Sequence, residues 1–175
     1  MIKKIFLVLL TLLTASCSTF NVPLDSRLDS SVGKGLAVFS FTSQGALSNF
    51  NLHYRDTSNG TEGAITQWTL KDTLDWEDVT RGRLVTMELP EGKYELYKLR
   101  APHISSRGAF SIPFEITAGK AVYFGNVHVN LLARSLFTIN ISDESDRDIS
   151  LFLSKYSNIS KEDVVTMISK FEKGA

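Results

Sequence analysis

Apolar and polar side chains alternate along several short stretches of this chain. In residues 36–41, Leu36 and Val38 lie on one side of an extended backbone, and Phe39 and Phe41 lie on the other. A period of two residues is typical of a β-strand with one buried face. The pattern predicts strands over residues 36–41, 49–56, 64–70, 83–89, 93–101, 109–116, 121–129 and 135–141.

Turn-forming residues separate these strands. Residues 90–93 (Pro-Glu-Gly-Lys) and residues 117–120 (Thr-Ala-Gly-Lys) place proline or glycine where tight turns need them. Many short strands joined by turns favour antiparallel pairing over a parallel sheet. The sequence therefore predicts a mainly β fold, an antiparallel β-sandwich of about seven or eight strands with a short C-terminal helical segment.

The period changes near the C-terminus. Apolar residues there lie three and four positions apart, as on one face of a helix: Ile149, Phe152, Leu153 and Tyr156. Ser145 and Asp148 match a capping box at the start of this helix. A second helix is predicted over 161–173, with Ser160 and Asp163 as its capping box. We expect both apolar stripes to pack on the sandwich, with the binding of a partner as the alternative.

The N-terminal residues have the layout of a secretory signal peptide. Lys3 and Lys4 supply positive charge, an apolar run follows over residues 5–13, and small residues precede Cys17. The apolar run is much shorter than the ~20 residues that a membrane-spanning helix needs. Cys17 is the only cysteine, so an exported chain has no partner for an internal disulfide.

The stretch Thr14-Ala15-Ser16-Cys17 resembles the lipobox of bacterial lipoproteins. In that family the cysteine is lipidated and becomes the new N-terminus, and two or more acyl chains anchor a protein firmly. The resemblance implies lipid attachment at Cys17. Because Ser18 rather than Asp follows, it also implies export to the outer membrane, with the domain facing the periplasm or the cell surface. An ordinary secreted protein with a cysteine in its signal peptide is the alternative.

This interpretation divides the chain into three parts. Residues 1–16 are the signal peptide, and residues 17–32 are the lipidated N-terminus with a polar tether. Residues 33–175 form a single β-sandwich domain that ends in the C-terminal helices, about residues 145–173.

Two turn motifs add a second resemblance. The motif LP-x-G-x-Y lies at residues 89–94, and the motif GK-x-x-Y lies at residues 119–123. Both are similar to turns of the carboxypeptidase-regulatory-like or transthyretin-like β-sandwiches that occur in many bacterial lipoproteins. The resemblance implies a fold and an envelope setting, and it implies no catalytic residues.

Charge and motif content exclude several classes of protein. The chain carries 19 basic and 19 acidic residues without a basic block, so we expect no nucleic-acid partner. No histidine lies in a metal-binding spacing such as HExxH, and no Walker or dinucleotide motif is present. We therefore expect neither a metal nor a cofactor.

The best candidate for a ligand site is the stretch 100–108, which joins two predicted strands. Arg100, His103 and Arg107 gather positive charge there, next to two serines. Such a loop suits an anion, for example a phosphate or a carboxylate of the envelope. A solvated hairpin loop without a ligand is the alternative.

No motif points to catalysis. The sequence therefore predicts a non-catalytic binding, scaffolding or accessory module of the cell envelope, bound to the membrane through its lipid anchor, with an envelope protein as a candidate partner. The alternative is an envelope hydrolase with an unrecognised active site. A serine, an acid and a histidine gathered in a concave pocket would favour the enzyme, whereas an exposed apolar patch would favour the binding module.

Overall fold

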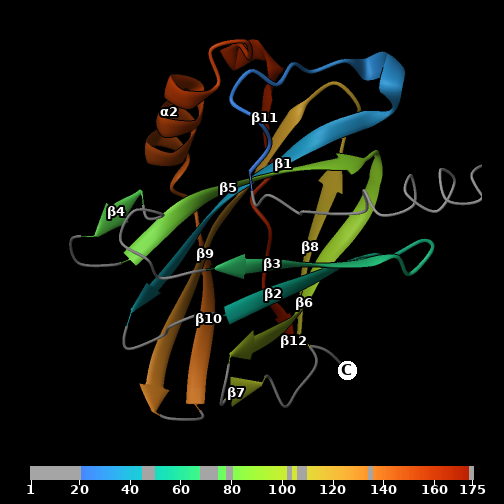
Figure 1. Ribbon diagram of the computed structural model, residues 1–175. Coiled ribbons are helices and arrows are strands. Elements are labelled where there is room, and N and C mark those ends of the chain that lie inside the picture. Colours follow the sequence, from blue (N-terminus) through green and yellow to red (C-terminus); the bar gives the residue numbers. More distant parts are fainter. Residues whose placement is uncertain are drawn as a thin grey trace, which may run out of the picture.

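The computed structural model describes residues 21–44, 50–67, 75–77, 81–101, 104–105, 110–133 and 136–173. Within these residues the fold is mainly β, as predicted, with two sheets, one α-helix and two 3-10 turns (Figure 1). The largest cluster of buried apolar side chains draws residues from both sheets, which therefore face each other as a sandwich.

Every predicted strand has a counterpart among the described residues, although residues 49, 68–70, 109 and 135 of the predicted ranges lie outside them. The counterparts are β1 (Lys34–Gln44), β2 (Phe50–Asp56), β3 (Glu62–Gln67), β5 (Arg81–Pro90), β6 (Gly92–Ala101), β8 (Phe110–Ile116), β9 (Ala121–Ala133) and β10 (Leu136–Ser142). The described residues also form short strands that the pattern did not predict: β4 (Trp76–Glu77), β7 (Ile104–Ser105), β11 (Val164–Thr166) and β12 (Glu172–Lys173). Strands this short display no period in the sequence.

The first sheet has the order β10-β9-β1-β5-β4, with β11 also beside β9. It differs from the prediction because β1 runs parallel to β9, from Leu36 opposite Ala121 to Gln44 opposite Asn130. Strands joined by a tight turn must be antiparallel, as β9 and β10 are. β1 and β9 are far apart in the chain, so that requirement does not apply to them.

The second sheet has the order β12-β8-β6-β2-β3, with β7 also beside β6, and the strand pairs among its described residues are all antiparallel. A row of stacked aromatic rings joins it to the first sheet. Phe39 of β1 lies 4.6 Å from Phe124 of β9, centroid to centroid, and Phe124 lies 4.5 Å from Phe114 of β8. Phe114 in turn stacks on Tyr94 of β6 at 5.5 Å. These rings fix the spacing of the two sheets.

Helix α2 (Ser145–Lys155) covers the outer face of the first sheet, as predicted. Phe152 and Tyr156 are fully buried there against apolar residues of β1, β5 and β9. The predicted capping box at Ser145 is not formed, because Glu144 is the N-cap residue and its side chain makes no capping hydrogen bond, while Asp143 accepts from the N–H of Ser145 at 2.9 Å. Asp148 instead lies buried beneath the helix, where it bonds to the sheet.

The second predicted helix, over 161–173, is wrong. Its capping box does form, and the Ser160 hydroxyl donates to Asp163 at 2.7 Å, but only a 3-10 turn follows, η3 (Lys161–Asp163). The chain then extends as β11, where Val164 pairs with Ala121 of β9. β-branched valines favour strands, and the free edge of β9 supplies hydrogen bonds that outweigh the helical spacing.

The part of the expected tether that the structure describes, 21–32, lies on the domain. The Asn21 side chain accepts from the Thr86 N–H at 2.9 Å and donates to the Leu84 carbonyl at 3.2 Å, so it covers the edge of β5. Val22 and Leu28 pack against the cluster beneath α2. Residues 21–32 are therefore packed on the sandwich.

Candidate binding groove at the edge of strand β8

Only part of the predicted site lies in the described residues. Cys17, His103 and Arg107 fall outside them. Arg100 is exposed near the end of β6 and pairs with Ser105 of β7, so the described part of this stretch is a β-hairpin. This pairing agrees with the hairpin-loop alternative, and the anion site remains a prediction.

The surroundings of Arg100 are basic. Arg100 lies on β6, and β2 is the neighbouring strand. There His53 of β2 pairs with Lys98 of β6. Partial burial, together with the positive charges of Lys98 and Arg100, lowers the pKa of His53 below its ordinary value.

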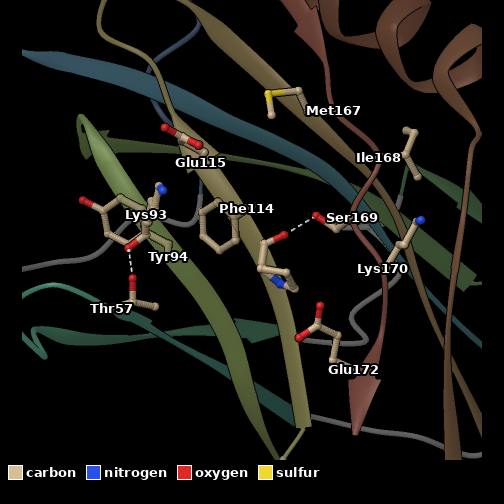
Figure 2. Close-up of a pocket in the computed structure, with 11 residues that line it drawn as sticks. Thr57, Lys93, Tyr94, Phe114, Glu115, Met167, Ile168, Ser169, Lys170 and Glu172 are labelled. Atoms are coloured by element: carbon tan, nitrogen blue, oxygen red, sulfur yellow. Dashed lines mark hydrogen bonds between the residues drawn. The ribbon is translucent and has the colours of Figure 1, made fainter. Parts of the chain in front are cut away.

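A groove of about 580 Å³ lies elsewhere, beside β8, where the C-terminal chain crosses from the first sheet to the second (Figure 2). Its size is within the usual range of ligand pockets, about 300–1,000 Å³. The groove is lined by Thr57, Lys93, Tyr94, Pro113, Phe114, Glu115, Met167, Ile168, Ser169, Lys170 and Glu172.

The extended C-terminal segment, residues 167–171, forms one wall of this groove. The N–H of Met167 donates to the Tyr123 carbonyl at 2.8 Å, and the N–H of Ser169 donates to the Phe124 carbonyl at 3.0 Å. These bonds hold the segment on β9. Met167 and Ile168 are 47% and 36% exposed, so their apolar side chains are open to a ligand rather than packed as a helical stripe.

Strand β8 forms the opposite wall. Pro113 has no N–H, and its carbonyl accepts from the Ser169 hydroxyl at 2.5 Å, as Figure 2 shows. Backbone groups of alternate residues face the same edge of a strand, so the N–H and carbonyl of Glu115 also point to this edge. β12 covers the edge only at Phe110 and Ser111. The wall therefore offers backbone hydrogen bonds to an extended chain.

Aromatic rings line the base of the groove. Phe114 and Tyr94 are buried members of the stacked row. The Tyr94 hydroxyl donates to the Pro90 carbonyl at 2.9 Å, which explains why the tyrosine follows the turn at this spacing. Burial raises the pKa of Tyr94, so the hydroxyl stays a donor at neutral pH.

Charges of both signs surround the apolar base. Lys93 and Lys170 are exposed, as are Glu115 and Glu172. None of the four forms an ion pair with another residue that the structure describes. A balanced rim of this kind does not select an anion or a cation, but it suits a polypeptide that carries both signs.

A second polar site lies buried beneath α2. Asp148 has no exposed surface, and its Oδ2 accepts from the Ser40 hydroxyl at 2.5 Å and from the Tyr123 hydroxyl at 2.7 Å. Its Oδ1 accepts from Nε of Arg147 at 2.8 Å. Burial and the nearby carboxylate strongly raise the pKa of Tyr123, so this tyrosine stays protonated and donates.

The network continues along β9 to a histidine. Ser40 and Thr42 both lie 2.9 Å from Oδ1 of Asn126, and the Thr42 hydroxyl lies 2.8 Å from Nδ1 of His128. A serine, an acid and a histidine thus share one network. Ser40 is fully buried and bonds to the acid, whereas His128 bonds to Thr42, so the network offers no exposed, base-activated nucleophile.

Sequence reasoning missed both sites. The groove was hidden because residues 167–171 show helical spacing. The buried network had a signal: Ser40 and Thr42 continue the outward face of β1 after Leu36 and Val38. A strand face that turns from apolar to hydroxyl side chains indicates buried hydrogen-bond partners from another element.

Comparisons with known proteins identify no relative: no protein-family model, no curated protein and no solved structure matches the chain. Among the described residues, no group of histidine, cysteine and acidic side chains is placed to hold a metal ion. In the same part of the chain, no helix is long and apolar enough to cross a membrane. Both family resemblances therefore remain predictions.

Replacing Asp148 by Ala should lower the free energy of unfolding by about 1–3 kcal/mol, because it leaves the buried hydroxyl of Tyr123 without its acceptor, whereas Ser40 can still donate to Asn126. Urea unfolding measures the change. Asp146→Ala is the matched control, since Asp146 is exposed in the first turn of the same helix and should cost less than about 1 kcal/mol. Equal losses for the two variants would contradict the role of Asp148.

The domain should lose stability in mild acid. Burial lowers the pKa of His128 below its ordinary 6.5, so the unfolded chain binds this proton at a higher pH than the folded one. The stability due to His128 is then complete above pH 6.5 and falls as the pH drops through the lowered pKa. The slope of the free energy of unfolding against pH corresponds to at most one proton for this histidine. Thermal unfolding as a function of pH measures this, and His128→Gln should flatten the curve. A variant with the wild-type pH dependence would show that His128 does not contribute.

Proposed function

We propose that this protein is a lipid-anchored lipoprotein of the bacterial cell envelope whose sandwich is a non-catalytic binding module. The groove beside β8 is the observation that carries the binding role. It combines exposed Met167 and Ile168, an aromatic base and the partly uncovered backbone of β8. No side chain that lines the groove has the arrangement of a nucleophile with its base.

The proposed ligand is an extended segment of an envelope protein. An extended chain adds to an open strand edge through backbone hydrogen bonds, and its side chains fill neighbouring pockets. The flexible side chain of Met167 adapts to ligands of different shape. Lys93 and Lys170 on one hand, and Glu115 and Glu172 on the other, would pair with opposite charges along such a segment.

The proposed location rests on the N-terminal residues. The signal-peptide layout before Cys17 supports export and lipid attachment, and Ser18 supports the outer membrane as the destination. Among the described residues, the serine and the acid that share a network with a histidine are Ser40 and Asp148, and their lack of exposed surface does not favour the rival function, an envelope hydrolase. The binding module is therefore the function that the geometry supports better.

Replacing Cys17 by Ala should abolish the incorporation of a labelled fatty acid and leave the precursor uncleaved, because the thiol is the attachment point. Acyl labelling in cells, followed by electrophoresis and mass measurement, tests this. Ser18→Thr is the matched control and should be labelled normally. Labelled acyl chains on the Cys17→Ala protein would refute the lipid anchor.

A photo-crosslinking amino acid in place of Ile168 should capture an envelope protein in cells, since this side chain lines the groove. The same amino acid in place of Ser150, which is exposed on α2, is the control and should capture much less. Met167→Lys should reduce the capture at position 168 by placing an unmatched charge in the groove. Equal capture at both positions would argue against the groove as the binding site.

A further inference from the structure

The N-terminal segment, residues 21–33, is held at both of its ends. At one end, Asn21 bonds to the edge of β5, and the N–H of Val22 donates to the Thr86 carbonyl at 3.3 Å. At the other end, the carbonyl of Gly33 accepts from the N–H of Glu91 at 2.9 Å. The segment is thus a fixed part of the domain surface.

A close contact fixes the middle of this segment as well. The 3-10 turn η1 (Ser30–Val32) lies against the turn between β8 and β9. A Cβ on Gly119 would come within 2.8 Å of the Ser30 side chain, so the two turns are packed without space between them. Gly119 also has a φ of 70°, which favours glycine.

Three residues separate Cys17 from Asn21. A fully extended chain advances at most about 3.3–3.6 Å per residue, so the two Cα atoms lie within about 14 Å of each other. The sixteen-residue tether expected from the sequence would have allowed a separation of about 50 Å. If Cys17 carries lipid, this short link leaves the domain no room to stand away from the bilayer.

We infer that the domain rests directly on the lipid bilayer through the surface of residues 21–33, with Leu24 and Val32 in contact with lipid. This inference depends on the proposed lipid anchor at Cys17. Leu24 and Val32 are 61% and 59% exposed, the highest values among the large apolar side chains that the structure describes. Exposed apolar side chains beside a lipid anchor enter the interface between headgroups and acyl chains.

The charges in this surface are few and not basic. Residues 21–33 carry Asp25, Asp29 and one basic residue, Arg27, and the following Lys34 pairs with Glu88 of β5. The surface therefore has no electrostatic preference for anionic lipid, in contrast to a polybasic membrane-binding segment. Contact with the bilayer should depend on the short link and on the apolar side chains, and it should be insensitive to salt.

This orientation leaves the groove accessible. Asn21 lies at the edge of β5, whereas the groove lies beside β9 and β8, on the other side of β1 in the first sheet. Figure 1 shows residues 21–33 in blue, running over the end of the sandwich where β1 begins. The groove runs from Lys93 and Glu115, near this end, along β8 to Glu172 of β12, so a partner would approach along the side of the sandwich.

The experiment uses the lipidated protein in vesicles of phosphatidylethanolamine and phosphatidylglycerol. Thioether formation consumes Cys17, so Leu24→Cys or Val32→Cys supplies the one free thiol for an environment-sensitive dye. Spin-labelled lipid should quench the dye at either position at least about twofold more than at Thr138→Cys, an exposed control on β10. Quenching should persist at high salt and with phosphatidylglycerol omitted.

A second variant tests the short link. Inserting roughly 15 glycine and serine residues between Phe20 and Asn21 should lower the quenching at position 24 to the control value while lipidation is kept. Equal quenching at positions 24, 32 and 138 in fully lipidated protein would overturn the inference and leave the anchor intact. A purified protein whose mass shows no lipid on Cys17 would overturn the proposed anchor and the inference together.

Discussion

The parallel pairing of β1 with β9 is the constraint on which the other features of this structure depend. β9 is the longest strand described, with 13 residues, and it carries β1 along one edge and β11 and β10 along the other. The register shifts between Val38 and Ser40, where β9 contains one additional residue. Gly125, with a φ of 117°, lies in this bulge.

The bulge decides which side chains of β9 reach each face. Phe124 points into the sandwich and stacks between Phe39 and Phe114. Tyr123 and Asn126 both point to the outer face, where they meet Asp148 and Ser40. The same short stretch of β9 thus supplies the central ring of the aromatic core and the side chain that binds Asp148 of α2. A buried carboxylate is costly unless it is fully bonded, so α2 has one favourable position on the sheet.

The edges of β5 and β8 are covered to different degrees. The edge of β5 is covered by Asn21 and Val22, and by Asp75, which accepts from the Leu84 N–H. The edge of β8 is covered only at one end, and Ser169 crosses it with a single side-chain hydrogen bond. Uncovered strand edges bind other chains. The edge of β5 thus faces the N-terminal segment, whereas the edge of β8 is partly uncovered; β3 and β10 also end their sheets with one neighbour each among the described residues.

The sequence by itself determined the long strands and the helix over 145–155. In β8 and α2 the buried face follows from local periodicity, because β8 buries alternate residues and α2 buries residues one helical turn apart. The tertiary structure decided the rest. Residues 164–166 form a strand because β9 has a free edge there, and Asp148 is a buried acceptor because Ser40 and Tyr123 converge on it from strands remote in the chain. Residues 21–32 lie on the domain because Val22 and Leu28 pack against the apolar cluster beneath α2. A local pattern carries no information on contacts between residues that are distant in sequence. The groove beside β8 and the packing of residues 21–32 on the domain could therefore be seen only in the tertiary structure.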